Sequence, residues 1–408
     1  MKNYLKLGGN LHPPKKEPVF DSVIIRYGGE MGIKGAWTRR TYEKRLLSNI
    51  RRVLKHYGIP YERIVWKRGR LFLKTSSPME ASTRLLKVFG ISSVSPAIET
   101  TSKIEDITDL CIFLAHSKLK KGNSFAVRCR RVGKHPYTSI DVCRYVGQKI
   151  LEAFPDLELK VNLENPDVTF MVEIRDELAF VFTEIMRGSG GFPLGVQPKL
   201  VCLLSGGIDS PVACWLVMKR GCPIIPIYFD NSPFTSSEAT ERVLDVAKVL
   251  FDWAIGLPRE IYVIKHGKNL AEIIRKCPRE FTCILCKRMM YRIAERIADM
   301  EKAEGIVTGE SIGEQASQTL RNLRVLNQAA TKYPVHRPLL GFDKVEIENI
   351  ARKIGTYEVS ARDVGKCTAA PPKPSTKARI NEVVKAEENL NINDIIENSL
   401  KELEKIHL

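Results

Sequence analysis

Apolar and polar positions in the first part of the chain alternate as expected for a small α+β domain. Residues 19–27 (VFDSVIIRY) predict a strand, and residues 38–57 predict a basic helix with apolar residues on one face. Residues 63–74 predict a hairpin that turns at Arg68-Gly69. The order strand, helix, paired strands predicts a ferredoxin-like domain, preceded by an irregular Pro/Lys-rich arm at residues 12–16.

A second α+β pattern follows and ends in a Gly/Pro-rich segment, residues 187–195, that predicts a linker. The pattern consists of helices near 80–89 and 105–118, a strand at 124–132, a helix at 139–151 and a hairpin formed by 168–174 and 178–183. We therefore predict one domain over residues 1–76 and a second over residues 77–186.

The spacing of apolar residues changes again after Lys199, where short apolar strands are expected to alternate with helices. The strands are expected at 200–204, 224–229, 261–266 and 305–309, and the helices at 211–220, 237–251 and 285–302. Repeated strand–helix units predict a parallel sheet with helices on both faces. A Lys/Glu-rich helical tail is expected over 377–406, so that residues 187–408 form a third domain.

The charge is concentrated at one end of this pattern. The 408 residues carry a net charge of +17, and residues 1–74 alone hold 18 Lys and Arg against 5 Asp and Glu. A basic region on a near-neutral body is typical of a surface that binds a polyanion, because each neutralised phosphate releases counterions. The alternative is a basic surface that faces only solvent.

Nothing in the sequence indicates export or membrane insertion. The first twenty residues lack the apolar core of a signal peptide, and no stretch approaches the roughly 18 apolar residues that span a bilayer. The ten cysteines are scattered, mostly within apolar segments, which is typical of reduced thiols. We expect a cytoplasmic protein that does not associate with membranes.

The strongest local motif is Ser205-Gly206-Gly207-Ile208-Asp209-Ser210, placed between a predicted buried strand and a predicted helix. Glycines let the backbone approach a phosphate, and the helix N-terminus offers free N–H groups to an anion. The two serines can donate hydrogen bonds, and Asp209 can hold Mg²⁺ or orient a phosphate. The alternative is a tight turn without a ligand.

This motif resembles the pyrophosphate loop of the PP-loop ATP pyrophosphatases, and no Walker-type GxxxxGK[ST] motif is present. Further segments extend the resemblance: LCKRMM at 285–290, VTGE at 307–310, QASQTL at 315–320 and Arg337-Pro338-Leu339. Together they are similar to the tRNA 4-thiouridine synthetase (tRNA sulfurtransferase) family. That resemblance implies a ferredoxin-like domain, a THUMP RNA-binding domain and a Rossmann-like PP-loop domain, in this order.

The resemblance also implies a nucleotide site and a reaction. Besides the loop residues, its nucleotide contacts would be Leu203, Leu204, Tyr228, Phe229, Lys287, Gly309 and Gln318. ATP with Mg²⁺ would adenylate O4 of a uridine in tRNA, expected at position 8, and sulfur would then displace AMP. Lys287 suits this role, since a cation stabilises charge that accumulates on phosphates.

A cysteine is needed to deliver the sulfur. Cys367, in a polar Gly-Lys-Cys-Thr segment, resembles the family's catalytic cysteine, and Lys366 beside it favours a thiolate. The Cys283-x-x-Cys286 pair is open to three interpretations: a redox pair, half of a metal site, or coincidence. The preferred prediction is that Cys283, Cys286 and Cys367 hold an iron–sulfur cluster. The second is that the pair resolves a Cys367 persulfide as a disulfide. The third is a zinc site with Cys277 as the fourth ligand.

Partners and rival functions complete the prediction. Arg128, Arg130, Arg131 and Lys134 are candidate RNA contacts, although a solvent-exposed sheet edge is the alternative. The chain carries no rhodanese domain, so sulfide or a cysteine desulfurase is the expected sulfur donor. A homodimer is expected by resemblance. The alternatives are another RNA thiolation, sulfur donation for the thiazole of thiamine, or a THUMP-type RNA-binding protein without activity.

Overall fold

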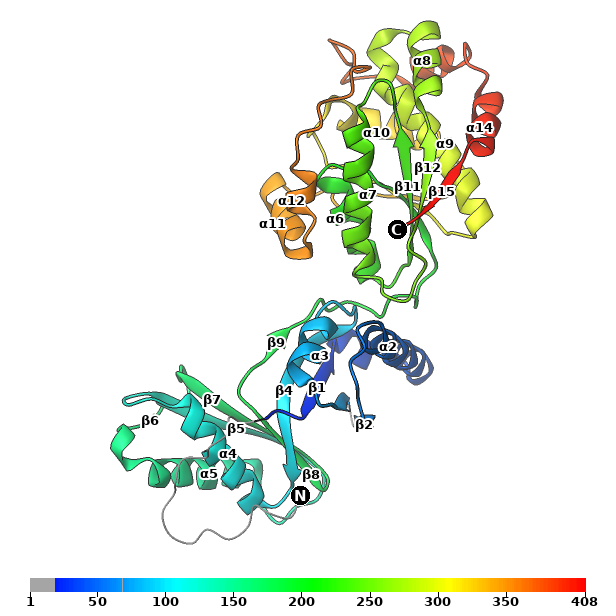
Figure 1. Ribbon diagram of the computed structural model, residues 1–408. Coiled ribbons are helices and arrows are strands. Elements are labelled where there is room, and N and C mark those ends of the chain that lie inside the picture. Colours follow the sequence, from blue (N-terminus) through cyan, green and yellow to red (C-terminus); the bar gives the residue numbers. More distant parts are fainter. Residues whose placement is uncertain (1–18, 68) are drawn as a thin grey trace. The chain divides into compact units, whose positions relative to one another are not determined.

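The computed structural model describes residues 19–67 and 69–408, and its elements are drawn in Figure 1. The predicted arm at 12–16 and Arg68 of the predicted turn lie outside these residues. Contacts group the chain into two units. Of the residues that the structure describes, the N-terminal unit contains residues 19–32, 54–86 and 91–189, and the C-terminal unit contains residues 33–53, 87–90 and 190–408. Among the described residues, no helix has the length and apolar character needed to cross a membrane.

One sheet, in the order β2-β3-β1-β4-β8-β7-β5-β6 with β9 added to β4, runs through the N-terminal unit. Its strands are β1 Ser22–Tyr27, β2 Arg63–Lys67, β3 Arg70–Lys74, β4 Ile91–Thr101, β5 Ser124–Val132, β6 Lys160–Val161, β7 Val168–Arg175, β8 Leu178–Phe182 and β9 Met186–Arg187. The strand order 4-1-3-2 of the first four, all antiparallel, confirms the ferredoxin-like prediction.

Strand β4 joins the two halves of this sheet. Its first part pairs with β1 and its last part, Ile98 to Thr101, pairs with β8. The helical segments along this part of the sequence are α1 Gly29–Gly32, α2 Ala36–His56, α3 Pro78–Leu85, α4 Ile104–Lys118, α5 Ser139–Ala153 and the 3-10 turn η1 Pro155–Leu157. Helices α4 and α5 cover the second half, with Phe125 and Phe170 buried beneath them.

A second sheet, in the order β14-β13-β10-β11-β12-β15, forms the centre of the C-terminal unit. Its strands are β10 Leu200–Leu203, β11 Ile224–Asp230, β12 Glu260–Lys265, β13 Ile306–Val307, β14 Val335–His336 and β15 Glu404–His407. All pairs are parallel except β12 with β15. The parallel sheet expected for a Rossmann-like PP-loop domain is therefore confirmed.

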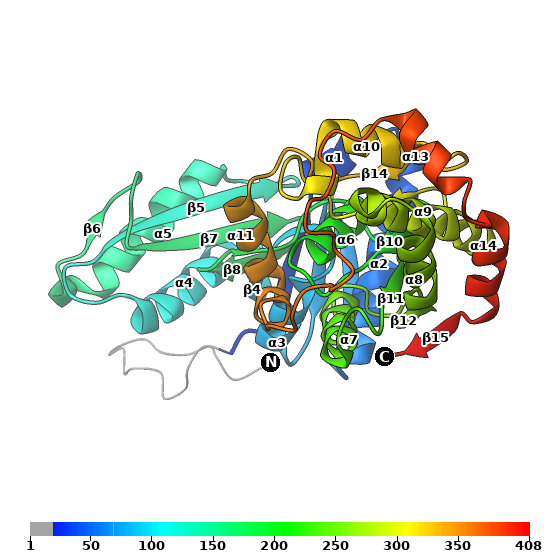
Figure 2. The same cartoon turned by 90° about the horizontal axis from the view of Figure 1, so that it is seen from above.

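Helices lie on both faces of this sheet. Successive residues of a strand point to opposite faces, so neighbouring residues of β10 belong to different cores. Val201 belongs to the core under α8, α9 and α14, whereas Cys202 belongs to the core under α6, α7 and α11. Figure 2 shows the two helix layers on either side of β10, β11 and β12. The helices are α6 Asp209–Lys219, α7 Ser237–Phe251, α8 Gly267–Lys276, α9 Thr282–Glu301, α10 Leu320–Asn327, α11 Lys344–Ile354, α12 Tyr357–Ser360, α13 Ile380–Glu387 and α14 Ile392–Lys401, with 3-10 turns η2 Arg279–Phe281 and η3 Ala316–Gln318.

The strand order places the loop that follows β10 at a switch point. Strand β10 is central, β11 and β12 continue on one side of it, and β13 and β14 continue on the other. Ligands of open parallel sheets bind at the carboxyl ends of strands where the order reverses. The loop of residues 204–208 leaves β10 at this end and leads directly into α6.

Several sequence predictions were wrong in detail. The expected helical tail over 377–406 is two helices followed by strand β15, which hydrogen-bonds to the free edge of β12. The long strand β4 was missed because Pro96 interrupts its pattern, although Pro96 sits in register with Val23. Helices α8, α10 and α11 were not predicted. The predicted strand at 305–309 is reduced to the two residues of β13.

Residues from the N-terminal third also belong to the C-terminal unit. The Asn49 side chain on α2 donates a hydrogen bond to the Leu194 carbonyl at 3.0 Å, and Gln197 donates to the Tyr42 hydroxyl at 3.1 Å. The Tyr42 ring packs edge-on against Phe192, with centroids 5.3 Å apart. The segment 192–197, which includes the end of the linker predicted at 187–195, is therefore held by α2.

Candidate functional site

The two serines of the loop 205–210 fix its shape. The Ser205 amide donates to the Ser210 Oγ at 2.8 Å, and the Ser210 hydroxyl donates to the Ser205 carbonyl at 3.0 Å. The Gly207 amide reaches the Ser205 Oγ at 3.4 Å. No side chain caps the N-terminus of α6, so its first amides are available to an anion.

Two glycines of the site permit close approaches that no other residue allows. A Cβ atom at Gly309 would lie 2.7 Å from the backbone nitrogen of Ser210. A Cβ atom at Gly206 would lie 2.5 Å from Nε of Arg242 on α7. Gly309 therefore brings the segment after β13 against the start of α6. Its contact with a nucleotide stays a prediction.

Asp209 is bound by a lysine that the sequence prediction missed. The Lys344 ammonium lies 2.8 Å from Asp209 Oδ1 and 2.6 Å from Glu314 Oε1. Burial raises the pKa of Asp209 above its usual value, although the hydrogen bond and charge of Lys344 act in the opposite direction. Two carboxylates thus converge on one cation beside the loop.

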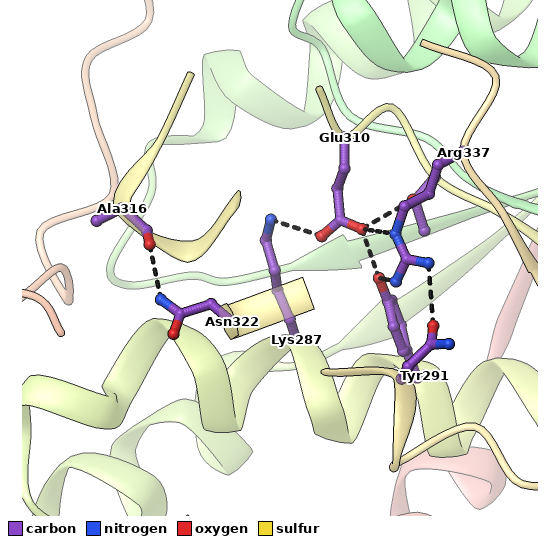
Figure 3. Close-up of polar contacts among 8 residues, drawn as sticks. Lys287, Tyr291, Glu310, Ala316, Asn322 and Arg337 are labelled. Atoms are coloured by element: carbon purple, nitrogen blue, oxygen red, sulfur yellow. Dashed lines mark hydrogen bonds and ion pairs between the residues drawn. The ribbon is translucent and has the colours of Figure 1, made fainter. Parts of the chain in front are cut away.

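A buried carboxylate, Glu310, organises the polar groups beside Gly309. It accepts hydrogen bonds from Lys287 at 3.0 Å, Arg337 at 2.8 Å and the Tyr291 hydroxyl at 2.8 Å, as Figure 3 shows. Burial acts to raise the pKa of Glu310, but the charges of Lys287 and Arg337 outweigh it and the pKa is lowered. The Lys287 ammonium is therefore held at a fixed point on the side of the site opposite α6.

Some buried polar atoms around the site have no partner within the protein. These atoms are Oε1 of Gln318, Oδ1 of Asn231 and Nε of Arg242. By contrast, Asn322 is fully paired, since its amide donates to the carbonyls of Ala316 (Figure 3) and Ser375 at 2.7 and 2.8 Å. Because buried polar groups are normally paired, the unpaired atoms indicate a polar ligand. Gln318 was predicted from the resemblance; the other two were not.

The predicted adenosine contacts lie on opposite faces of the sheet. Tyr228 is buried in the core under α7, with its hydroxyl 3.2 Å from Thr240 Oγ1, whereas Phe229 packs edge-on against His266 in the core under α8 and α9. Leu203 and Leu204 are divided between the same two cores. Their contact with a nucleotide stays a prediction.

Two of the three predicted sulfur-site cysteines are partly exposed neighbours. Cys283 lies in the first turn of α9, and burial together with the adjacent Cys367 raises the pKa of its thiol. Lys287 is four residues further along the same helix and therefore lies on the same face as Cys283. The chain segment after Cys367 is fixed nearby by the Thr368 amide, which donates to the Phe234 carbonyl at 2.9 Å.

Cys286, the third, is buried against a histidine. The Ser399 hydroxyl donates its hydrogen to the Ile395 carbonyl, so it accepts a hydrogen bond from the side-chain amide of Asn269. The same amide nitrogen lies 3.1 Å from Nδ1 of His266. Nδ1 is then the acceptor, which leaves the proton on Nε2, 3.5 Å from the Cys286 sulfur. Burial lowers the pKa of His266 to about 4, so the ring is neutral at pH 7 and donates to Cys286.

The three thiols do not form a ligand set as they stand. Within residues 19–67 and 69–408, no group of three or more His, Cys, Asp or Glu side chains is placed to hold a metal ion. In this arrangement Cys286 faces His266, while its thiol also interacts electrostatically with Cys283 and Cys367. The cluster at these three cysteines stays a prediction. Cys277 instead donates to the Ala386 carbonyl, which gives no support to the zinc alternative.

The candidate RNA residues divide by strand alternation. Arg128 and Arg130 on β5 are exposed and share one face of the sheet, whereas Arg131 points to the other face and bonds to the Gly133 carbonyl. Lys134 is exposed in the loop after β5. A further set of arginines, missed in the sequence, surrounds the buried Glu173, with Arg26 at 3.6 Å and Arg70 at 3.3 Å.

Comparison with known proteins covers nearly the whole chain. Residues 22–95 match the ThiI ferredoxin-like domain, residues 101–184 the THUMP domain and residues 195–392 the thiamine biosynthesis protein (ThiI) family. A protein of Methanosarcina mazei named "Probable tRNA sulfurtransferase" is 44% identical over 382 residues, 93% of each chain. One of the same name from Caldanaerobacter subterraneus is 39% identical over 95% of this chain and 100% of its own.

Solved structures agree with these matches. A 4-thiouridine synthetase in complex with RNA and ATP is 34% identical, covers 95% of this chain and 99% of its own, and superimposes with a TM-score of 0.85. A Pyrococcus horikoshii protein is 27% identical over 82% of this chain and 99% of its own, with a TM-score of 0.66.

Proposed function

This chain belongs to the tRNA sulfurtransferase family, and on that basis we propose that it uses ATP to replace O4 of a uridine in tRNA with sulfur, forming 4-thiouridine. The uridine at position 8 is the proposed target. The observation that carries the proposal is the arrangement on α9. Lys287 pairs there with Glu310, the residue after Gly309, and Cys283, whose thiol interacts electrostatically with Cys367, lies one turn away.

The first half of the reaction takes place at the loop 205–210. The amides of this loop and of the α6 N-terminus bind the phosphates that leave as pyrophosphate. Lys287, held by Glu310, stabilises the charge that develops as the uridine O4 attacks the α-phosphate. Adenylation converts a poor leaving oxygen into AMP, which a sulfur nucleophile displaces.

Magnesium fits the carboxylates beside this loop. Mg²⁺ in nucleotide sites is held by one or two carboxylates together with substrate phosphates. Asp209 and Glu314 converge on the Lys344 ammonium and would hold the ion there. When bound, Mg²⁺ neutralises phosphate charge, which assists the departure of pyrophosphate.

The second half of the reaction uses Cys367 and Cys283. A persulfide on Cys367 attacks C4 through its outer sulfur and expels AMP. The Cys283 thiolate then attacks the Cys367 sulfur of that S–S bond, which forms a Cys283–Cys367 disulfide and releases the 4-thiouridine thiolate. A dithiol reductant restores both thiols. Cys286, bonded to His266, takes no part in this sequence.

The partners follow from this chemistry. The proposed substrate is tRNA, contacted by the exposed Arg128, Arg130 and Lys134. The proposed sulfur donor is a cysteine desulfurase, whose persulfide passes its outer sulfur to the Cys367 thiolate, or sulfide, which attacks the Cys367 sulfur of the Cys283–Cys367 disulfide and releases the Cys283 thiolate. Ten unpaired cysteines and a tRNA substrate favour the cytoplasm. We propose a homodimer as the tRNA-binding form; light scattering that gave one chain per tRNA would contradict it.

Sulfur donation for thiamine thiazole is a second candidate, since the matched family is described as a thiamine biosynthesis protein. A Cys367 persulfide would serve both purposes, and only the tRNA reaction needs the ATP site. Loss of thiamine prototrophy in a strain that carries only Cys367→Ala would support the second role.

The proposed function is tested by incubating the chain anaerobically with unmodified tRNA and Mg-ATP and measuring 4-thiouridine by nucleoside mass spectrometry. The sulfur source is cysteine with a cysteine desulfurase or, for chain that holds the Cys283–Cys367 disulfide, sulfide. We expect product from the wild type and none from Cys367→Ala, whereas Cys222→Ala should behave as the wild type.

The contrary outcomes separate the alternatives. Pyrophosphate release without thiouridine would mean that the proposed target base or the proposed sulfur source is wrong. Binding of tRNA without pyrophosphate release would favour a non-catalytic RNA-binding protein, and loss of product on iron removal would restore the cluster.

A further inference from the structure

Arg242 lies directly over the nucleotide loop, yet the function described so far gives it no role. It projects from the first half of α7 so that a Cβ atom at Gly206 would be 2.5 Å from its Nε and 3.3 Å from its Cζ. The guanidinium therefore lies against the backbone of the residue whose amide is expected to face a phosphate, and a side chain at 206 would displace it from this position.

Arg242 forms no close ion pair among the described residues. Its Nη1 donates to the Arg362 carbonyl at 2.6 Å, while its buried Nε has no hydrogen-bond partner. No carboxylate within the described residues lies within 4.0 Å of it. Burial lowers the pKa of Arg242, while the charges of Tyr228 and Asp363 act in the opposite direction. A guanidinium with an open N–H beside a phosphate-binding loop has the chemistry of a phosphate ligand.

The Arg362 carbonyl belongs to the connector that carries Cys367, here defined as residues 361–379 between α12 and α13. Two more contacts join this connector to α7. The Arg362 guanidinium pairs with Asp245 at 2.8 Å, and the Ser236 hydroxyl donates to the Val364 carbonyl at 3.2 Å. Arg242 thus touches both the loop at Gly206 and the connector.

We propose that Arg242 binds a phosphate of ATP and, through the Arg362 carbonyl, holds the Cys367 connector in place while the nucleotide site is occupied. This inference rests on the proposed function, since it deepens the ATP site. A phosphate that pairs with Nε fixes the plane of the guanidinium, and the same plane directs Nη1 at Arg362. Nucleotide binding and the position of the sulfur-bearing cysteine are then linked by one planar group.

The test compares Arg242→Met and Arg242→Lys with the wild type, using Arg275→Met, an exposed arginine on α8, as the matched control. Two quantities are measured: the KM for ATP in pyrophosphate release with tRNA, and the rate of Cys367 alkylation with and without Mg-ATP, read by peptide mass spectrometry. Thermal unfolding midpoints establish that each variant is folded.

In the wild type we expect ATP to slow Cys367 alkylation several-fold. Arg242→Met should raise the KM for ATP about 10- to 100-fold, the loss expected for one charged hydrogen bond, and should abolish the effect of saturating ATP on alkylation. Arg242→Lys should recover part of the KM but not the alkylation effect, because one ammonium does not span both partners. Arg275→Met should match the wild type in both.

A wild-type KM in Arg242→Met, or alkylation in the wild type that ATP leaves unchanged, would overturn the inference. The two failures are distinct from failure of the proposed function. If the wild type forms 4-thiouridine and Arg242→Met has normal kinetics, only the role of Arg242 is wrong. If the wild type binds ATP but forms no thiouridine, the proposed function is wrong while the alkylation result still tests Arg242.

Discussion

The Lys287 ammonium lies 3.0 Å from Oε1 of Glu310, a carboxylate that is only 4% exposed and also accepts from Arg337 and Tyr291. One buried anion therefore sets the positions of two cations at the edge of the nucleotide site. The position of Lys287 is fixed before any ligand arrives, which lowers the cost of organising charge during the reaction.

Glu310→Gln should impair pyrophosphate release more than binding. Without the carboxylate, Lys287 and Arg337 repel each other and lose their shared acceptor, so we expect kcat to fall roughly 10- to 100-fold, the effect of about one misplaced electrostatic group. Steady-state pyrophosphate release measures this effect, with the exposed Glu358→Gln as control. An unchanged kcat would mean that Lys287 is positioned by something other than Glu310.

Lys344→Met and Asp209→Asn should shift the magnesium dependence in opposite directions. Removing the Lys344 ammonium frees Asp209 and Glu314, so half-saturation should need less Mg²⁺. Asp209→Asn removes a ligand and should raise the requirement about 10-fold or more, as expected when one charged contact is lost. Titration of pyrophosphate release with Mg²⁺ distinguishes the two, and shifts of the same sign would argue against a shared cation position.

Gly309→Ala should disrupt the nucleotide site by steric conflict alone. The added Cβ would lie 2.7 Å from the Ser210 nitrogen, and backbone on both sides leaves no flexible group to move. We expect a stability loss of about 1–3 kcal/mol, typical of overpacking, together with loss of ATP binding. Gly341→Ala, whose Cβ would meet nothing within 4 Å, is the matched control. Normal ATP binding by Gly309→Ala would show that Gly309 is not part of the site.

A single turnover without reductant should leave a Cys283–Cys367 disulfide. Both thiols are partly exposed and adjacent, whereas Cys286 is buried and bonded to His266. Peptide mapping under non-reducing conditions identifies the pair, and Cys283→Ser should trap tRNA on Cys367. A disulfide that included Cys286, or thiouridine formed with no disulfide at all, would contradict this assignment.

Glu387→Gln should destabilise the C-terminal unit in a pH-dependent way. Burial acts to raise the pKa of Glu387, but hydrogen bonds from Arg288 and Arg292 outweigh it and the pKa is lowered. Its stabilisation is therefore full above the unfolded-state pKa, near 4.5, and is lost as the pH falls through the lower folded-state value. We expect a loss of about 3 kcal/mol at pH 7, because Arg288 keeps its charge in a buried place.

Denaturant unfolding at pH 7 and at pH 3.5 measures this difference, with the exposed neighbour Glu388→Gln as control. The gap between Glu387→Gln and wild type should shrink at the lower pH. A gap that stays constant would show that Glu387 contributes through packing and not through its charge.

Local patterns in the sequence were sufficient for the elements that carry chemistry. The helix at 237–251 and the strand at 124–132 have the predicted bounds, and the loop 205–210 follows a buried strand as expected. Strand β15 was missed because its polar sequence becomes a strand only through pairing with the edge of β12, which lies about 140 residues earlier.

The partners of the predicted residues were harder to find. Three of them lie in no recognisable sequence motif, and each is identified only by a contact with a residue distant in the sequence. Arg242 lies against Gly206, Lys344 pairs with Asp209, and His266 contacts Cys286. The arginines on β5 are divided by the fold in a way that their sequence proximity does not reveal. The alternation of a strand sends Arg131 to the face opposite Arg128 and Arg130, and the contact of all three with RNA stays a prediction.

The contacts of α2 with residues 192–197 limit how the molecule can be divided. Asn49 and Tyr42 support a segment that the nucleotide-binding sheet also needs, so a gene fragment that begins at residue 187 would leave Phe192 and Leu194 without their cover. No single cut in the polypeptide yields the ATP-binding half intact. Recombination that swaps this half alone between relatives should therefore produce poorly folding hybrids, unless residues 33–53 travel with it.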